Sequence, residues 1–177
     1  VRTTDGGATW VCDTIHGAPA SWTNTSISAV DANTAWVLMF DLSGALSGGV
    51  FSTTNGGLTW TQQTTAFPGG GGFADFVKFF DVNNGLCVGD PKGGYFEIYT
   101  TTNGGTNWAR VPSANIPAPL SQEAAGVDAY CIVGDTLWFP TYSGRLYRTT
   151  NRGLNWSVTT VPNVSGSPIL VPAFRDL

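Results

Sequence analysis

Short apolar runs recur along the whole chain, and turns rich in glycine, asparagine and threonine separate them. Three of these runs, residues 50–52, 98–100 and 146–148, each place two apolar or aromatic residues before a polar one. Short runs bounded by glycine and asparagine predict β-strands, because an amphipathic helix needs a longer stretch with a period of about 3.6 residues. The pattern therefore predicts an all-β chain built from many short antiparallel strands.

One eight-residue pattern, which we call the box, occurs four times. It reads Thr-Thr, then Asp or Asn, any residue, Gly, any residue, Thr or Asn, and Trp. Successive box tryptophans are 50, 48 and 48 residues apart. A repeat of this length has the size of one supersecondary unit. The recurring box positions are Thr3, Asp5, Gly7 and Trp10; Thr53, Asn55, Gly57 and Trp60; Thr101, Asn103, Gly105 and Trp108; and Thr149, Asn151, Gly153 and Trp156.

Each box has the composition of a hairpin turn. An Asp or Asn side chain can accept hydrogen bonds from backbone N–H groups further along a turn, and glycine adopts positive φ without a steric penalty. Strand-like residues flank the boxes on both sides, and such flanks around an Asn-Gly turn are typical of a β-hairpin. The box residues are therefore predicted to stabilise turns.

The remainder of each repeat predicts two further strands. An aspartate follows each box tryptophan by 20 or 21 residues, after an apolar run such as 76–80 or 125–127. A second run follows the first three aspartates, at 35–40, 85–89 and 130–133, with 137–139 as a further part of the last. Four strands per repeat predict a β-propeller of four-stranded antiparallel blades. The recurring aspartates are Asp31, Asp81, Asp128 and Asp176.

We expect a single domain over residues 1–177, forming part of a propeller with three full blades and a partial blade at each end. Two ring arrangements remain open. In the first, further blades come from the same or another chain; in the second, the two partial blades complete a small closed ring. Apolar blade faces would be exposed in an open fragment, which favours the first arrangement. The predicted blade segments are 1–12 (partial), 26–63, 75–111, 124–160 and 169–177 (partial).

The composition excludes some classes of partner. Charged residues make up 11% of the chain, the net charge is −4, and the lysines are Lys78 and Lys92. Nucleic-acid binding is not expected without a basic stripe, and no apolar run is long enough to span a membrane. The scarcity of lysine resembles secreted proteins, so we expect a secreted or cell-surface protein. Cys87 and Cys131 lie in apolar runs and are expected to be buried free thiols.

The box resembles the Asp box, or BNR repeat, of sialidases and related propellers, and the similarity covers nearly the whole chain. The stretch between boxes at residues 80–89 is most similar to YCF48-like propellers and to bacterial secreted forms. This resemblance implies a propeller whose boxes lie on the blade rim, away from the active-site mouth. Asp5, Asn55, Asn103 and Asn151 would then be structural. The fold hosts unrelated activities, so the resemblance does not select one.

The sequence predicts no catalytic residue, no cofactor and no metal site. By the resemblance, a sialidase would need three arginines that converge on the substrate carboxylate. Here Arg2 and Arg148 occupy one repeat position, and Arg152 replaces a turn glycine. A glycosidase needs paired carboxylates, but most of the twelve acidic residues recur at repeat positions. The interpretation therefore leans towards a protein that is not an enzyme.

Binding remains as the expected role. Connections between the fourth strand of one blade and the first strand of the next lie at one end of a propeller, where loops carry function. Aromatic residues there or in neighbouring hairpins could stack on a sugar or a protein partner: Trp22, Phe73, Tyr95 and Tyr142. We expect a non-catalytic binding or scaffold module for a protein or glycan partner at the propeller face. The alternatives are a fragment of a glycan-active hydrolase, sialidase-like or xyloglucanase-like, with catalytic residues outside this segment, and a YCF48-like assembly factor.

Overall fold

The computed structural model describes residues 1–12, 14–43, 48–68, 72–162 and 173. Within these residues, twelve strands form three four-stranded antiparallel sheets, and η1 (Ser113–Asn115) is a single turn of 3-10 helix. The all-β prediction is confirmed. Among the described residues, no helix is long and apolar enough to cross a membrane.

Each sheet contains four strands that are consecutive in the chain and neighbours in space. This order arises because each connection is a hairpin. The first sheet contains β1 (Trp22–Ala29), β2 (Ala35–Asp41), β3 (Gly48–Thr53) and β4 (Thr61–Gln63). The second contains β5 (Ala74–Phe79), β6 (Gly85–Pro91), β7 (Phe96–Thr101) and β8 (Ala109–Arg110). The third contains β9 (Cys131–Val133), β10 (Thr136–Pro140), β11 (Arg145–Thr149) and β12 (Ser157–Thr160).

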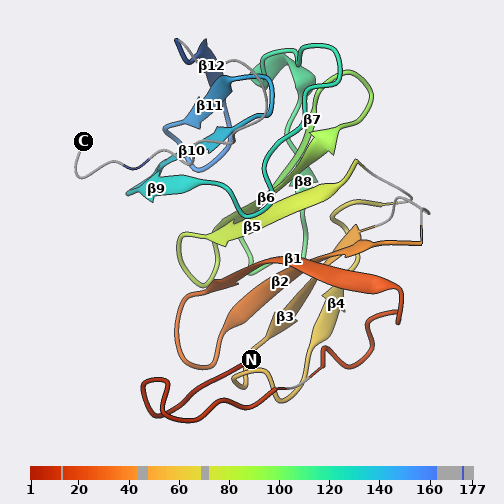
Figure 1. Ribbon diagram of the computed structural model, residues 1–177, viewed down its shortest axis with the longest axis vertical. Helices are drawn as coiled ribbons and strands as arrows, with labels where there is room; N and C mark the ends of the chain where they lie inside the picture. The colour runs from red at the N-terminus through yellow and green to blue at the C-terminus, as the bar shows by residue number, and fades with distance from the viewer. Residues whose placement is uncertain (13, 44–47, 69–71, 163–172, 174–177) are drawn as a thin grey trace.

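The three sheets lie one above another, and the N-terminal segment runs along the outer side of the first sheet (Figure 1). Side chains alternate between the two faces of each strand. In β6, Leu86 and Val88 pack towards the third sheet, whereas Cys87 between them packs towards the first. Both faces of the second sheet are therefore buried. One aromatic pair shows how close this packing is, since the rings of Trp36 and Phe79 stack with centroids 3.4 Å apart.

The first strands of the first two sheets, β1 and β5, meet along one edge of the assembly. The Ser26 hydroxyl of β1 accepts the Val77 N–H of β5 at 3.2 Å, and the Ser28 hydroxyl accepts the Phe79 N–H at 2.9 Å. Both serines are buried. Hydroxyl groups thus satisfy backbone donors at the inner edge of the next sheet, where no fifth strand is present to accept them.

The boxes form the turns between the third and fourth strands. In all four, the first threonine hydroxyl accepts the N–H of the glycine at the fifth box position at 2.9 Å. The same hydroxyl donates to the Asp or Asn side chain at 2.8 to 3.0 Å. That side chain in turn accepts the N–H of the residue before the tryptophan, at 2.9 to 3.0 Å. One hydroxyl and one carboxyl or amide group therefore hold the whole turn.

Arg152 shows how the turn tolerates a residue other than glycine. It has φ 56°, where the other boxes have glycine with φ 67° to 70°. This left-handed conformation costs a non-glycine residue roughly 1–2 kcal/mol. The side chain makes compensating contacts, to Asp135 Oδ1 at 2.7 Å and Asp81 Oδ2 at 2.9 Å, and it lies over the ring of Phe80.

The third sheet begins later than the sequence pattern indicates. Residues 125–127 were expected to form its first strand, but Ala125 makes only an isolated bridge to Thr141. The first strand is β9 instead, and Gly134 and Asp135 alone connect it to β10. The prediction was wrong because an apolar run before an aspartate resembles the strands of the first two repeats. The sheet spans Cys131–Thr160, within the predicted segment 124–160.

Asp128 consequently has a different role from the other recurring aspartates. Asp31 and Asp81 each accept backbone N–H groups two and three residues further on, closing the first hairpin of their sheets. Asp128 instead accepts the Ser26 hydroxyl at 2.7 Å, and its N–H donates to the Asp75 carbonyl at 3.2 Å. It joins the inner edges of the first two sheets. Asp176 lies outside the described residues, as does most of the predicted partial blade 169–177.

The cysteines are all free thiols. Cys87 is fully buried, as expected, and burial raises its pKa well above the usual range. Cys131 is only partly buried and Cys12 is exposed. The expectation of a buried thiol therefore holds for Cys87 and is wrong for Cys131, because β9 lies at the edge of its sheet.

Candidate functional site

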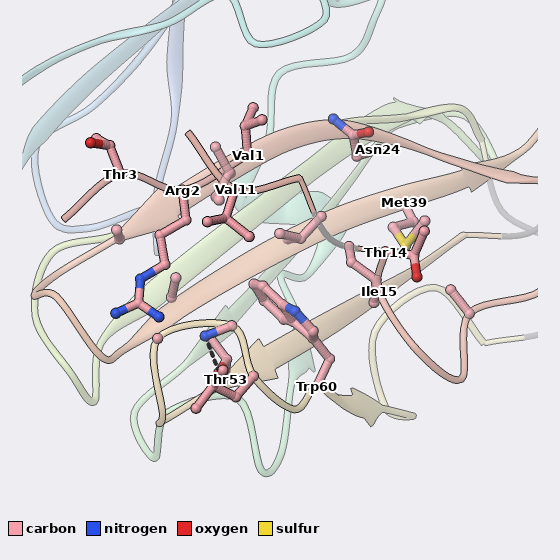
Figure 2. Close-up of a pocket in the computed structure, with 18 of the residues that line it drawn as sticks. Val1, Arg2, Thr3, Val11, Thr14, Ile15, Asn24, Met39, Thr53 and Trp60 are labelled. Carbon is pink, nitrogen blue, oxygen red and sulfur yellow. Dashed lines mark hydrogen bonds between the residues drawn. The ribbon is translucent and has the colours of Figure 1, made fainter. Parts of the chain in front are cut away.

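A groove of about 1040 Å³ lies between the first sheet and the N-terminal segment. Its floor is the face of β1 and β2 that points away from the second sheet, with Ile27, Val37 and Met39 among its residues. Val11 and Ile15 of the N-terminal segment line the opposite wall. Figure 2 shows these two side chains together with Met39 and Trp60, and Ile15 packs against the cluster that contains Met39. The groove is thus walled mainly by apolar side chains.

Few charged groups line the groove. Of the described residues that line it, two have charged side chains, Arg2 and Asp31. The Arg2 guanidinium carbon lies 3.0 Å from where a Cβ on Gly56 would be, so it covers the turn of the second box. The Asp31 carboxylate is occupied by the Asn33 and Thr34 N–H groups, which lower its pKa. This chemistry suits the binding of apolar groups, and the described lining residues include no nucleophile paired with a base.

Comparison with equivalent positions in the second sheet shows that the floor of the groove lacks a covering sheet. Ile27 and Val77 each lie four residues before the aspartate of their hairpin. Ile27 is 57% exposed, whereas Val77, which the first sheet covers, is fully buried. Since the two positions are equivalent, the difference arises from the presence or absence of a covering sheet. The floor of the groove is therefore an inter-sheet face that no complete sheet of the described residues covers.

The box tryptophans show the same gradient along the chain. Trp108 and Trp156 are 6% and 8% exposed, Trp60 is partly buried, and Trp10 is 61% exposed. The sequence of the four boxes does not distinguish these residues. What differs is the sheet that precedes each box, because that sheet covers the tryptophan.

Hydrogen bonds fasten each buried box to the preceding sheet. The Trp108 indole donates to Gln63 Oε1 at 3.0 Å, and its backbone N–H donates to Thr65 Oγ1 at 2.8 Å. At the next interface, the Trp156 backbone N–H donates to the Asn115 carbonyl at 2.9 Å. In both cases, the segment that follows the fourth strand of one sheet binds the box of the next.

The four aromatic residues proposed as ligand-binding do not form one site. Trp22 lines the groove and meets Phe51 edge-on at 6.2 Å. Phe73 packs on Phe40 between the first and second sheets, with ring centroids 4.2 Å apart. Tyr95 lies beneath the Arg110 guanidinium at 4.2 Å and packs against the core between the second and third sheets. Tyr142 is 47% exposed after β10.

Buried acids lie where strands of the second sheet begin and end. Asp75 is buried, and burial, followed by the nearby Asp90 charge, raises its pKa well above the usual range. Burial also raises the pKa of Asp90 to about 6, although this carboxylate accepts the Ala125 N–H at 3.0 Å. Glu97 accepts the Tyr99 hydroxyl at 2.6 Å. Among the described residues, no three His, Cys, Asp or Glu side chains form a group that could hold a metal ion.

A further buried acid ties the long connection after β8 to the third sheet. Glu123 accepts the Thr141 hydroxyl at 2.6 Å and the Arg145 Nε–H at 2.9 Å, and its other oxygen forms an ion pair with Arg145 Nη2. Burial pushes the pKa of Glu123 upward, but the hydrogen bonds from Arg145, Thr141 and Leu120 together lower it. These contacts give Glu123 a structural role, and the hydrolase alternative stays a prediction.

Sequence reasoning did not find the groove. Its walls come from residues far apart in the chain, such as Ile15, Met39 and Trp60. Each of these would be core in a repeat with a complete neighbour. The predicted partial blade 1–12 and the expected exposure of apolar blade faces indicated an open face, but they did not specify which residues line it.

Comparison with protein-family models finds no match, and comparison with curated proteins finds none either. Solved structures are similar. YCF48 bound to D1 peptide superposes with a TM-score of 0.58 and 23% identity, over 79% of this chain and 42% of that chain. YCF48 from Cyanidioschyzon merolae superposes with a TM-score of 0.51 and 24% identity, over 78% of this chain and 40% of that chain.

This similarity identifies the fold as a β-propeller, whose blades are the three sheets. The chain spans about two fifths of the length of these propellers. A propeller blade buries both faces against neighbours, which is the arrangement of the second sheet. The groove lies on the face of the first blade where a preceding blade would pack.

Proposed function

We propose that this chain is a protein-binding segment of a β-propeller and that the groove is its docking surface. The observation that carries the proposal is the open face of the first blade. Ile27 and Trp60 are exposed or partly exposed there, although their equivalents in the second blade are buried. Contiguous exposed apolar surface with a polar rim is typical of protein interaction sites.

The size and chemistry of the groove favour a polypeptide ligand. Small-molecule pockets usually have volumes of about 300–1,000 Å³, and the groove lies at the upper end of this range at about 1040 Å³. Two of its lining side chains are charged and most of the others are apolar, which suits a polypeptide better than a highly charged small ligand. One of the similar propellers is described as bound to a peptide, which supports peptide binding by this fold.

We also propose that the protein is secreted or exposed at a cell surface, which the low lysine content supports. A glycan is the second ligand class. The observation that favours it is Tyr142, an aromatic side chain that is 47% exposed at a blade end. Binding to a glycan array, and its loss in Tyr142→Ala, would test this second proposal.

Selection from a displayed library of random peptides, with the immobilised chain as target, tests the main proposal. Selected peptides should bind the unmodified chain and lose at least tenfold in affinity for Ile27→Asp, because the new carboxylate would be desolvated in the groove. Leu154→Asp is the matched control, since Leu154 is also an exposed apolar residue but lies in the box of the third blade. Peptides that bind Ile27→Asp as tightly as the unmodified chain would contradict the proposal, and so would a selection that yields no binders.

A further inference from the structure

The N-terminal segment contains half of a blade. Arg2 and Val11 exchange backbone hydrogen bonds of 2.8 Å in both directions. Arg2 and Val11 directly flank the first box. The residues that flank the next two boxes, Ser52 with Thr61 and Thr100 with Ala109, pair in the same way and join the third and fourth strands of complete blades. Residues 2–11 therefore form the outer hairpin of a blade.

The other edge of that hairpin has a defined partner in every complete blade. In the first blade, Phe51 and Thr53 of the third strand pair with Val37 and Ala35 of the second strand. Val1 and Thr3 occupy the positions of Phe51 and Thr53 in their own repeat. Within the described parts of the chain, the 2–11 hairpin pairs with no strand on that side. Both Val1 and Thr3 line the groove.

We propose that the groove accepts a pair of antiparallel strands, the first and second strands of a further blade of this repeat type. The pair would extend the 2–11 hairpin to four strands and cover the open face of the first blade. This inference rests on the proposed function, because it specifies which kind of polypeptide binds in the same groove. Strand addition satisfies backbone groups along an edge, while alternate side chains fill the apolar surface.

The interface between the first and second blades defines the chemistry of this pair. There the second strand of the covering blade contributes Trp36, Leu38 and Phe40 to the shared core. Its first strand contributes the Ser26 and Ser28 hydroxyls, which accept N–H groups of the next blade. The occupant should therefore carry alternating large apolar residues on one strand and small hydroxyl residues on the other.

The same comparison identifies the backbone groups that the occupant would reach. In the second blade, the N–H groups of Val77 and Phe79 donate to the serine hydroxyl oxygens. Ile27 and Ala29 are the equivalent residues of the first blade. Their N–H groups should become protected on binding, as should that of Thr3 at the hairpin edge.

The probe is a synthetic peptide with the sequence of residues 22–41, which contains the first two strands of the first blade. A fluorophore on the peptide allows fluorescence anisotropy to report binding to the intact chain. The matched control peptide carries Trp36→Ser and Leu38→Ser, which remove the large apolar residues and keep the turn. Hydrogen exchange, measured by NMR, then locates the contact.

The expected result is saturable binding that weakens at least tenfold with the control peptide and with Ile27→Asp in the chain. Leu154→Asp should change it less than twofold. Exchange at the amides of Thr3, Ile27 and Ala29 should slow at least tenfold in the complex. Absence of binding, or binding without this protection, would overturn the inference.

The two binding experiments distinguish the strand-pair inference from the broader proposal of protein binding. If displayed peptides bind in the groove and the strand-pair peptide does not, protein binding stands and the strand pair is rejected. Sedimentation velocity of the unlabelled chain tests a different occupant of the groove, a second copy of the chain. Self-association that Ile27→Asp abolishes would show that another copy fills the groove, and that result would overturn the strand pair as well.

Discussion

Replacing Thr101 with valine tests whether a single hydroxyl holds a box together. Thr101 is 4% exposed, and its Oγ1 accepts the buried Gly105 N–H at 2.9 Å and donates to Asn103 Oδ1 at 2.9 Å. Valine has almost the same shape, so the packing would change little. The Gly105 N–H would, however, lose its partner in a site that the preceding blade covers.

The expected cost follows from these contacts. A buried donor without a partner costs about 1–3 kcal/mol, and the lost hydroxyl donation costs about 0.5–1.5 kcal/mol. Together we expect the free energy of unfolding to fall by about 1.5–4.5 kcal/mol. Thr3→Val is the matched control, because Thr3 makes the same bonds in the first box, where Gly7 is only partly buried. Water can replace its hydroxyl, and we expect a loss below about 1 kcal/mol.

Urea denaturation followed by tryptophan fluorescence measures both changes, since the midpoint and slope give the free energy of unfolding. The comparison must be made at one pH and one protein concentration. A Thr101→Val variant that loses less than about 0.5 kcal/mol would refute the reasoning. Equal losses in the two variants would refute the part that depends on the covering blade.

Three further predictions concern charged groups. Glu123→Gln should reduce the free energy of unfolding by about 3–5 kcal/mol in urea titrations, because it leaves Arg145 partly buried without a counter-charge. Asp135→Asn should cost less than about 1 kcal/mol in the same assay, because the Asp135–Arg152 pair is solvent-exposed; a larger loss than in Glu123→Gln would contradict the argument. The pKa of Asp90 is raised to about 6, so its stabilising contribution is complete below its unfolded-state pKa and is lost as the pH rises through 6. Asp90→Asn should therefore flatten the decline in urea midpoint between pH 4 and pH 7, and a variant with an unchanged decline would contradict this assignment.

The repeated part of the fold could be predicted from the sequence because its signals are local. A threonine, an asparagine and two glycines within five residues, such as Thr53 to Gly57, determine the turn through hydrogen bonds inside the box. The Asp31 and Asp81 turns are local in the same way. The first hairpin of the third blade was missed because Gly134 and Asp135 form a shorter turn, and the apolar run before Asp128 resembles the strands of the other repeats.

The box sequences alone do not show which residues line the groove, because exposure depends on the neighbouring blade and not on the residue. Trp10 and Trp108 end boxes of the same pattern, yet one is exposed and the other buried. The proposed aromatic set illustrates the same limit. Trp22 lines the groove, whereas Phe73 lies within a core that the first two blades share. Composition alone cannot separate an aromatic residue that binds a partner from one that packs between blades.

The most direct test of the account is the solvent accessibility of individual tryptophan indoles. In NMR spectra of the ¹⁵N-labelled chain, each indole N–H gives one signal, and a soluble paramagnetic agent broadens those near solvent. The account predicts strong broadening for Trp10, intermediate broadening for Trp60, and little for Trp108 and Trp156, because each preceding blade covers the next box. Equal broadening of Trp10 and Trp108 would contradict the stacked-blade arrangement and, with it, the open face on which the proposed docking surface depends.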